Sequence, residues 1–317
     1  MSGQYIRMVV GSPASGKSSF VKNWVEKGYV LINRDTHKGA STLADLIPFY
    51  EKAIQNKSDI ILDNTFPTIA SRKPFVDLAA KYNVPIFCKV MDTSTEDCQI
   101  NALMRMHERY GKVFLDLESL KEVKGDPNMF PSAALFKYRK EFEMPTENEG
   151  FKLVDKISFV RQPWPKDFLN KAVIFDYDDT LRTSTGDKPY PVKLSDIKLL
   201  PGRKEMLKKY QDLGYILLGV SNQSGIAKGD LTKEMAIQCF EETNKQLGFK
   251  IDYNFCSHRI PPMTCYCRKP QSGLGLHFIL KYKLNPKECI MVGDMTSDKT
   301  FAKRIGFQYQ DQSEFFK

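Results

Sequence analysis

The chain has 317 residues, of which 42% are hydrophobic and 12% aromatic, and it carries a formal net charge of +9 at pH 7. This length is enough for two domains with separate cores. No apolar run reaches the ~18 residues that a membrane-spanning helix needs, and the N-terminus lacks the pattern of a cleaved signal, so we expect an intracellular protein. The seven cysteines are an odd number, which argues against a disulfide framework. The basic excess suits either a polyanionic partner or a solubilising surface.

Short β-rich runs alternate with helical stretches along the first half of the chain. The runs are YIRMVVG, YVLIN, DIILDNT and VPIFCKVMD, and strands that alternate with helices indicate a parallel sheet. The pattern stops at residues 161–170, where two prolines indicate a linker, and resumes with AVIFDYD, YILLGVSN and ECIMVGD. The sequence therefore predicts an α/β protein with two doubly wound parallel-sheet domains, at residues 1–163 and 168–317.

The stretch GSPASGKS, from Gly11 to Ser18, has the spacing of a phosphate-binding loop. It follows a predicted strand and opens a predicted helix, which favours this motif over a chance glycine-rich turn. Lys17 would contact the β- and γ-phosphates of a nucleotide, and Ser18 would coordinate Mg²⁺. We expect the nucleotide to contact Gly11, Ser12, Ala14, Ser15, Gly16, Lys17, Ser18 and Ser19.

Further polar residues follow the later strands of this half. Asp35 could accept the proton of an attacking hydroxyl or simply cap a helix. Asp63 and Asn64 end the third predicted strand, where Asp63 could hold a Mg²⁺-bound water or orient the acceptor. Arg105 and Arg109 lie four residues apart on one helix face, so they would either close over the transferred phosphoryl group or form a solvated basic face.

The stretches GSPASGKSSF, NRDT, DNTFPTIASRKPF and FKYRKEFEMPTENEGF together resemble the kinase domain of polynucleotide 5′-kinase/3′-phosphatases. The resemblance implies a P-loop kinase domain in which Asp35 is the general base for a nucleic acid 5′-hydroxyl. It implies that Arg105, and less directly Arg109, cover the phosphates, and that Arg72 lies near the acceptor. Lys38 departs from the bacteriophage members, which often have arginine there, so the resemblance assigns it no acceptor contact.

The motif DYDDT places Asp176 and Asp178 at the carboxyl end of an apolar strand. Where the strand turns into a loop, both carboxylates can converge on one pocket. One carboxylate would attack a phosphate and form a phospho-enzyme, and the other would protonate the leaving oxygen and then activate water. Because two carboxylates repel a phosphate dianion, this chemistry requires a cation, and Mg²⁺ suits oxygen ligands.

Ser221, Lys269 and Asp294 follow in order, in GVSNQSG, CRKPQSG and MVGDMTSD. Together with DYDDT they resemble the haloacid dehalogenase superfamily of phosphatases, which implies a Rossmann-like domain over residues 170–315. The resemblance implies that Asp298 orients neighbouring groups, and that Asp179 stands where the family usually has glycine, either as a fourth acidic ligand or as a tolerated loop residue. The implied roles are nucleophile for Asp176, acid/base for Asp178, phosphoryl binding for Ser221 and Lys269, substrate support for Thr180 and Asn222, and Mg²⁺ ligation for Asp176, Asp178 and Asp294.

The stretch CSHRIPPMTCYC holds three cysteines and a histidine, at Cys256, His258, Cys265 and Cys267. Three thiolates and one imidazole complete a tetrahedral Zn²⁺ site of the structural type, and buried free cysteines are the alternative reading. The pattern is similar to the zinc loop of phosphatases that act on histidinol phosphate and heptose bisphosphate, and NQSGI, from Asn222 onward, matches them as well. The resemblance implies that the metal stiffens a loop beside the substrate pocket.

These resemblances predict an enzyme with two opposite phosphate activities. The kinase domain would use ATP to phosphorylate 5′-hydroxyl ends of nucleic acid, and the phosphatase domain would remove 3′-phosphates, which prepares breaks for a ligase that could be a partner. One alternative is a kinase fused to a phosphatase of small sugar or imidazole phosphates. Another is a nucleotide-gated binding module with inactive sites, against which the intact set of Lys17, Asp35, Asp176, Asp178 and Lys269 argues.

Overall fold

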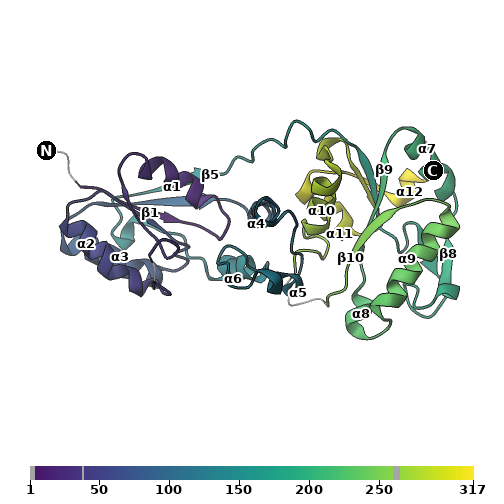
Figure 1. Ribbon diagram of the computed structural model, residues 1–317, viewed down its shortest axis with the longest axis horizontal. Coiled ribbons are helices and arrows are strands. Elements are labelled where there is room, and N and C mark those ends of the chain that lie inside the picture. Colours follow the sequence, from purple (N-terminus) through teal and green to yellow (C-terminus); the bar gives the residue numbers. More distant parts are fainter. Residues whose placement is uncertain (1–3, 38, 260–264) are drawn as a thin grey trace. The chain divides into compact units, whose positions relative to one another are not determined.

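The computed structural model describes residues 4–37, 39–259 and 265–317, and the chain forms two compact units (Figure 1). The N-terminal unit comprises Met1–Arg105 and Val123–Arg161, and the C-terminal unit comprises Met106–Glu122 and Gln162–Lys317. Residues 106–122 thus cluster with the second unit although they precede part of the first in the sequence. Within the described residues, no helix is long and apolar enough to cross a membrane.

The N-terminal unit is built on a five-stranded sheet in the order β2-β3-β1-β4-β5. All neighbouring strands run parallel. The strands are β1 (Ile6–Val10), β2 (Val30–Ile32), β3 (Ile60–Asp63), β4 (Ile86–Asp92) and β5 (Leu153–Ser158). Every residue of β3 is buried, as expected for a parallel sheet that is covered on both faces.

Helices cover both faces of this sheet because successive strand residues point in opposite directions. Val9 and Ile61 pack with Val21 of α1 on one face, and Met8 and Leu62 belong to a larger cluster with α2 and α3 on the other. The helices here are α1 (Lys17–Val25), α2 (Ile47–Gln55), α3 (Ile69–Lys81), the part of α4 (Thr95–Tyr110) up to Arg105, and α6 (Ala133–Glu141), with 3₁₀ turns η1 (Ala44–Leu46) and η3 (Glu147–Glu149).

The C-terminal unit repeats this plan with the strand order β10-β9-β6-β11-β12, again all parallel. Its strands are β6 (Ala172–Phe175), β9 (Ile216–Asn222), β10 (Asp252–Cys256), β11 (Ile290–Gly293) and β12 (Gln308–Asp311), and β7 (Arg182–Ser184) pairs antiparallel with β8 (Ile197–Leu199). The linker predicted at residues 161–170 lies in sequence between the end of β5 and the start of β6.

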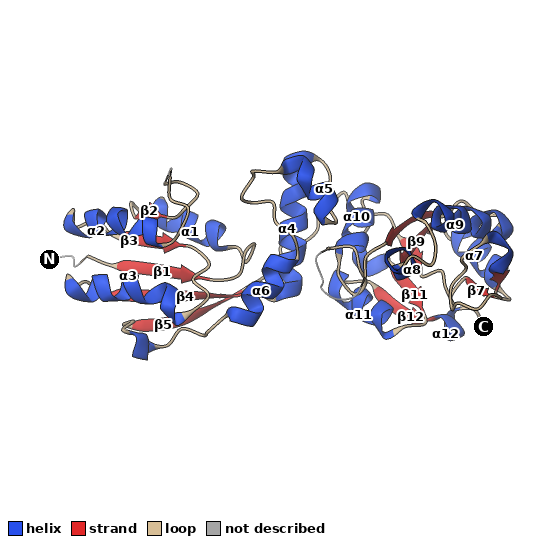
Figure 2. Cartoon of the chain, turned by 90° about the horizontal axis from the view of Figure 1, so that it is seen from below, coloured by secondary structure: helices blue, strands red, loops and turns tan. Residues whose placement is uncertain are grey.

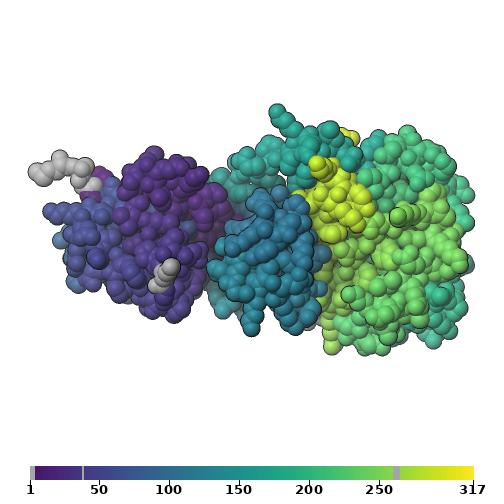
Figure 3. All heavy atoms as spheres, viewed as in Figure 1, coloured from purple at the N-terminus to yellow at the C-terminus, as the bar shows by residue number. Residues whose placement is uncertain are grey.

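Helices also enclose the second sheet (Figure 2). Leu207 of α7 and Phe240 of α9 pack against Val173 and Phe175 of the central strand, and Phe301 of α11 meets the glycine face of α10. The helices are α5 (Leu117–Leu120), α7 (Arg203–Asp212), α8 (Ser224–Lys228), α9 (Lys233–Leu247), α10 (Gly273–Tyr282), α11 (Thr296–Ile305) and α12 (Gln312–Phe315), with 3₁₀ turns η2 (Lys121–Val123), η4 (Leu194–Asp196) and η5 (Pro286–Glu288). The space-filling view shows one face of the chain, coloured along the sequence (Figure 3).

The predicted fold class, α/β with two parallel-sheet domains, is confirmed. In each sheet the first strand is central, and later strands were added on both of its sides. Such a reversal of strand order opens a crevice at the carboxyl ends of the strands, where α/β proteins bind ligands. The loop at Gly11 follows β1, and Asp176 follows β6, so each motif lies at a switch point.

Candidate active sites

The phosphate-binding loop connects β1 to α1 in a conformation that its small residues allow. Gly16 has φ 89° and Ala14 has φ 58°, both in the left-handed region. A Cβ atom on Gly11 would lie 2.7 Å from the Ser15 Oγ and 2.9 Å from the Met91 Cβ. Glycine is therefore required at positions 11 and 16 for two different reasons, close approach and backbone conformation.

Neighbouring elements fix the shape of this loop. The Thr93 hydroxyl donates to the Ser15 carbonyl at 2.9 Å, and the Asn101 amide donates to the Ala14 carbonyl at 2.9 Å. The Lys17 ammonium donates to the carbonyls of Gly11 and Ser12, at 2.9 and 2.8 Å. Burial lowers the pKa of Lys17 to about 8, against the opposing effect of the Asp63 carboxylate. A phosphate group near this ammonium would favour its charged form.

The loop opens on a cavity of about 270 Å³. Its lining includes residues 13–19 together with Arg34, Asp35, Asp63, Asn64, Arg105 and Asn128. The predicted base Asp35 is exposed and shares this cavity with Lys17. The structure thus brings the nucleotide-binding candidates and the acceptor candidates to one place.

Asp63 is the buried carboxylate of this cavity, with 7% of its surface exposed. One of its oxygens lies 3.5 Å from the Ser18 hydroxyl. Burial raises the pKa of Asp63, the nearby Asp35 raises it further, and Lys17 opposes the rise. A hydroxyl and a carboxylate are oxygen ligands of the kind that Mg²⁺ binds, so Ser18 and Asp63 fit the cation that accompanies a nucleotide.

Arginines line the same cavity. The Arg105 guanidinium donates to the Asn128 Oδ1 at 3.1 Å. Arg34 donates to the Asn64 Oδ1 at 3.3 Å; the sequence reasoning missed it, although it directly precedes Asp35. Arg109 is exposed in the last turn of α4, with its guanidinium 5.8 Å from the centre of the Tyr110 ring. Lys38 lies outside the described residues.

Arg72 is a correction to the predicted acceptor site. Its side chain is fully buried, and the guanidinium makes two contacts with the Glu149 carboxylate, at 2.7 and 2.9 Å. It also donates to the Phe66 carbonyl at 3.0 Å. A buried guanidinium needs such partners to offset its lost hydration, so Arg72 ties α3 to η3 instead of reaching the cavity.

In the C-terminal unit, Lys269 lies at the centre of the charged groups. Its ammonium is 2.8 Å from the Asp176 Oδ1 and 2.7 Å from the Asp298 Oδ1, and it donates to the Val220 carbonyl at 3.0 Å. Burial acts to lower the pKa of Lys269, but the two carboxylates outweigh it, and the pKa is raised. The Asn222 side chain accepts from the Lys269 N–H at 2.9 Å and donates to its carbonyl at 3.0 Å; this positions the lysine, in addition to the substrate contact predicted for Asn222.

Asp176, Asp294 and Asp298 form a carboxylate cluster whose oxygens lie within 4.8 Å of one another. Burial raises the pKa of Asp176 to about 7, with Asp298 and Asp178 adding to the rise and Lys269 opposing it. Burial also raises the pKa of Asp294. Because one ammonium cannot neutralise three carboxylates, two of which are buried, the donor set fits a divalent cation. Asp298, predicted only to orient its neighbours, belongs to this set.

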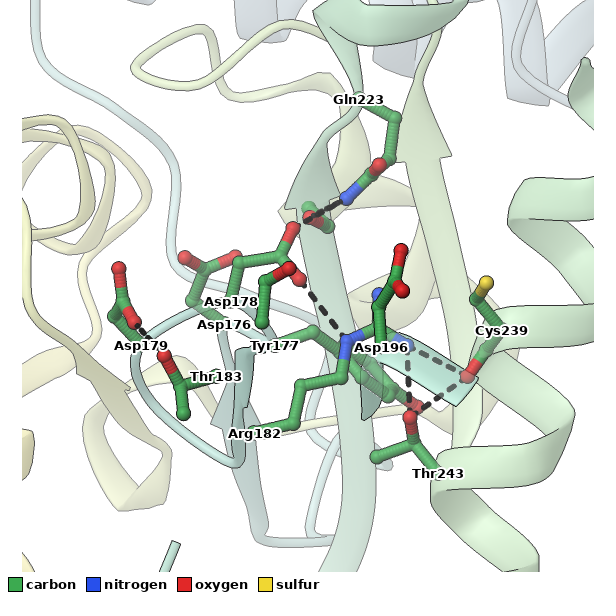
Figure 4. A network of polar contacts seen from close by, with 12 residues as sticks. Asp176, Tyr177, Asp178, Asp179, Arg182, Thr183, Asp196, Gln223, Cys239 and Thr243 are labelled. Carbon is green, nitrogen blue, oxygen red and sulfur yellow. Dashed lines mark hydrogen bonds and ion pairs between the residues drawn. The ribbon is translucent and has the colours of Figure 1, made fainter. Parts of the chain in front are cut away.

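The Asp178 carboxylate, predicted as a Mg²⁺ ligand, lies outside this cluster and is held by two other side chains (Figure 4). Arg182 donates to its Oδ1 at 3.0 Å and Gln223 to its Oδ2 at 2.7 Å. The buried Arg182 is itself fixed by the Thr243 hydroxyl at 2.7 Å and the Cys239 carbonyl at 2.6 Å. These contacts correct the predicted ligand role of the carboxylate, but Asp178 still lines the same cavity as Asp176.

That cavity measures about 480 Å³. Its lining includes Asp176, Asp178, Asp179, Tyr190, Ser221, Asn222, Arg268, Lys269 and Asp294. The sequence reasoning missed Tyr190 and Arg268, and also Gln223, which donates to the Ser221 hydroxyl at 2.9 Å. Thr180 is buried, and its hydroxyl lies 3.5 Å from the Asp294 Oδ1. Asp179 has φ 56°, a conformation that explains why the related phosphatases usually have glycine there.

The side chains of the four predicted zinc ligands, Cys256, His258, Cys265 and Cys267, lie close together. The His258 Nδ1 lies 3.3 Å from the Cys256 Sγ and 3.4 Å from the Cys267 Sγ, and the sulfurs of Cys256 and Cys265 are 3.8 Å apart. All four ligand atoms lie within 4.8 Å of one another. This closed set of three sulfurs and one nitrogen fits a tetrahedral metal ion.

Comparison with known families agrees with this geometry. Residues 6–126 match the family described as AAA domain, and residues 171–316 match the family described as polynucleotide kinase 3 phosphatase. Fold and sites together define a P-loop domain of the kinase type followed by a haloacid dehalogenase-type phosphatase domain. The two matches lie in the order that the motifs predicted, an N-terminal nucleotide-binding domain and a C-terminal phosphatase domain.

Individual relatives cover parts of the chain. The D-glycero-beta-D-manno-heptose-1,7-bisphosphate 7-phosphatase of Haemophilus influenzae is 33% identical over 139 residues, 41% of this chain and 74% of that protein. The bifunctional polynucleotide phosphatase/kinase of Schizosaccharomyces pombe is 30% identical over 178 residues, 56% of this chain and only 36% of that protein. A solved structure of a Pnkp1/Rnl/Hen1 complex covers 98% of this chain and 96% of its own, at 17% identity and a TM-score of 0.34.

Proposed function

We propose that the chain heals broken nucleic acid ends by adding a phosphate at the 5′-hydroxyl and removing one from the 3′-end. The observation that carries the proposal is the pair of cavities at equivalent sheet edges. One joins Asp35 to the phosphate-binding loop, and the other joins Asp176 to Lys269 and a carboxylate cluster. The first arrangement suits transfer to a hydroxyl, and the second suits removal of a phosphate.

In the kinase step, the Asp35 carboxylate accepts the proton of the 5′-hydroxyl, whose oxygen then attacks the γ-phosphorus of ATP. Lys17 and Arg105 face the charge that spreads over the transferred group and the leaving diphosphate. Ser18 and Asp63 would hold Mg²⁺, which neutralises phosphate charge when bound. The exposure of Asp35 suits an acceptor that arrives from solvent.

In the phosphatase step, an Asp176 oxygen attacks the 3′-phosphate and forms a phosphoaspartate. Lys269 and the Ser221 hydroxyl hold the phosphoryl oxygens. Asp178 donates a proton to the leaving 3′-oxygen and then accepts one from the water that hydrolyses the phosphoaspartate. Mg²⁺ held by Asp176 and Asp294 would offset the repulsion between nucleophile and phosphate.

We also propose that the Cys/His set holds Zn²⁺ in a structural role, since all four positions of a tetrahedron are taken by protein ligands. Cys267 lies two residues before Lys269, so the metal would fix the phosphoryl-binding lysine. A ligase that joins the healed ends remains our prediction for a partner.

The decisive experiment compares two substrates with the full chain. An oligonucleotide with a 5′-hydroxyl and a 3′-phosphate should gain a 5′-phosphate from ATP and lose its 3′-phosphate. The similarity to heptose bisphosphate phosphatases makes a small-molecule phosphatase the second candidate. If heptose bisphosphate is hydrolysed and the oligonucleotide keeps both ends, the second candidate replaces the first.

A further inference from the structure

We infer that the Cys/His metal site is completed by a distant segment of the chain, residues 113–119, in which Asp116 is the positioning residue for His258. The inference rests on the proposed metal, but the segment itself contains none of the four metal ligands. The segment belongs to the C-terminal unit together with the ligands. It lies more than a hundred residues before them in the sequence.

The first observation is the direction of the His258 ring. Its Nδ1 faces the sulfurs of Cys256 and Cys267, and its Nε2 lies 3.8 Å from the Asp116 Oδ2. A metal bound at Nδ1 leaves Nε2–H as the only donor of the imidazole. At 3.8 Å the two atoms are beyond hydrogen-bonding distance, and a small rotation of the ring would bring them within it. A carboxylate at that position fixes the ring and makes the bound nitrogen a better ligand.

The second observation is a backbone hydrogen bond that joins this segment to the residue between two metal ligands. Tyr266, which separates Cys265 from Cys267, donates its N–H to the Leu115 carbonyl at 2.7 Å. Gly273 makes room for this contact, because a Cβ there would lie 2.4 Å from the Tyr266 carbonyl oxygen and 2.8 Å from the Leu115 Cδ2. The segment therefore holds the ligand loop at its backbone as well as at His258.

The third observation explains why Asp116 points toward the histidine. Its Oδ1 accepts from the N–H and the hydroxyl of Ser119, both at 2.8 Å, and so caps α5. This cap orients the carboxylate and leaves Oδ2 for His258. The orientation is thus set before metal binds, which reduces the entropy cost of ordering the site.

One consequence reaches beyond the metal. Residues 106–122 follow directly after Arg105, which lines the nucleotide cavity. The metal ligands Cys265 and Cys267 flank Tyr266, which contacts this segment. Metal binding should therefore also order the segment. Loss of the metal should then release residues 106–122 from the C-terminal unit.

The test is Asp116→Asn, because asparagine keeps the cap on α5 and removes only the charge that faces His258. Glu118→Gln is the matched control, since Glu118 is an exposed carboxylate on the same helix that pairs with Lys121. Affinity for Zn²⁺ is measured by competition with a chromophoric chelator. We expect Asp116→Asn to bind about 10- to 100-fold more weakly, and the control and the melting temperature of the metal-free protein to stay unchanged.

The outcomes separate the two proposals. A wild-type chain that binds no metal ion would show that the metal site itself is wrong, and the inference falls with it. A wild-type chain that binds Zn²⁺ while Asp116→Asn binds it equally well overturns the inference and leaves the metal site standing.

Limited trypsin digestion gives a second measurement that does not depend on affinity. Lys112 has a side chain that is 55% exposed, so cleavage there reports whether the adjoining segment is held. We expect cleavage after Lys112, followed by mass spectrometry, to be faster after chelation, and faster in Asp116→Asn than in wild type at limiting Zn²⁺. Equal rates with and without metal would contradict the docking of the segment.

Discussion

The two cavities occupy equivalent places in two sheets of the same plan, yet they differ in how they hold charge. In the N-terminal unit Arg34 and Asp35 are exposed, on the loop after β2, and Asp63 is the buried carboxylate of the cavity. In the C-terminal unit Asp298 is fully buried and Lys269 and Asp176 are only 3% and 8% exposed. The phosphate-binding loop relies on backbone groups, whereas the second cavity relies on buried side chains.

This difference follows from the proposed chemistry. A kinase binds a nucleotide whose phosphates and Mg²⁺ already carry the main charges of the site. The side chains that contact the substrates can therefore lie on exposed loops. A phosphatase that forms a covalent bond with Asp176 must hold that carboxylate rigidly, and burial against Lys269 does so. The buried groups then depend on one another, as the raised pKa of Asp176 indicates.

The largest expected effect is that of Asp176→Asn on the buried cavity. Removing the nucleophile should lower 3′-phosphate release by about 10⁴-fold or more, because an amide at this position cannot form the phosphoaspartate. Release of phosphate from an oligonucleotide measures this, with Asp212→Asn, an exposed carboxylate on α7, as the control. Kinase activity should persist. A parallel loss of 5′-phosphorylation would mean that the two cavities are not independent.

Asp35→Asn tests the exposed cavity in the same way. Loss of the general base should reduce 5′-phosphorylation by about 10²- to 10⁴-fold and leave 3′-phosphate release unchanged. Transfer of labelled phosphate from ATP is the measurement, and Glu26→Gln, exposed on the same unit, is the control. A kinase that tolerates the substitution would show that Asp35 is not the general base.

Arg72→Met examines a charge that the N-terminal unit buries outside its cavity. Breaking the pair with Glu149 leaves a buried carboxylate unpaired, so we expect the unit to lose about 3–5 kcal/mol of stability. Urea unfolding of the N-terminal unit would measure the loss, and Arg72→Met combined with Glu149→Leu should restore most of it. An unchanged stability with a raised KM for the nucleic acid would instead favour the original acceptor assignment.

The smallest expected effect is the pH dependence of stabilisation by Mg²⁺. Burial raises the pKa of Asp176 from 3.8 to about 7, so in metal-free protein the folded state holds a proton that the unfolded state has lost. Stability is therefore lost as pH rises through this range, and Mg²⁺, which binds the ionised carboxylate, should raise the melting temperature more at pH 8 than at pH 6. Calorimetry with and without a chelator checks this, and Asp176→Asn should remove the difference. A shift that is equal at both pH values would contradict it.

Much of both cavities could be predicted because their motifs are local. Gly11 to Ser18 form one loop, and its position after a strand fixes which atoms face a phosphate. The DYDDT motif likewise follows β6 directly, and parallel strands bring their carboxyl ends to one edge. The four Cys/His ligands lie close enough in sequence for their spacing alone to indicate a metal.

Other assignments failed or were missed because they depend on distant partners. Arg72 pairs with Glu149, and nothing near either residue in the sequence indicates the pair. The Asp178 carboxylate accepts hydrogen bonds from Gln223, which follows another strand, as well as from the nearby Arg182. Asp116 looks like an ordinary helix cap until the fold brings it to His258.

The sequence by itself determined the fold class, the order of the two domains and the groups that could carry the chemistry, because strand period, loop glycines and ligand spacing are properties of short stretches. Only the tertiary structure decided which carboxylates lie together, which arginine is buried in an ion pair, and which segment contacts the Cys/His ligands. Those choices depend on burial and on contacts between residues far apart in the chain, and burial sets the cost of leaving a charge unpaired.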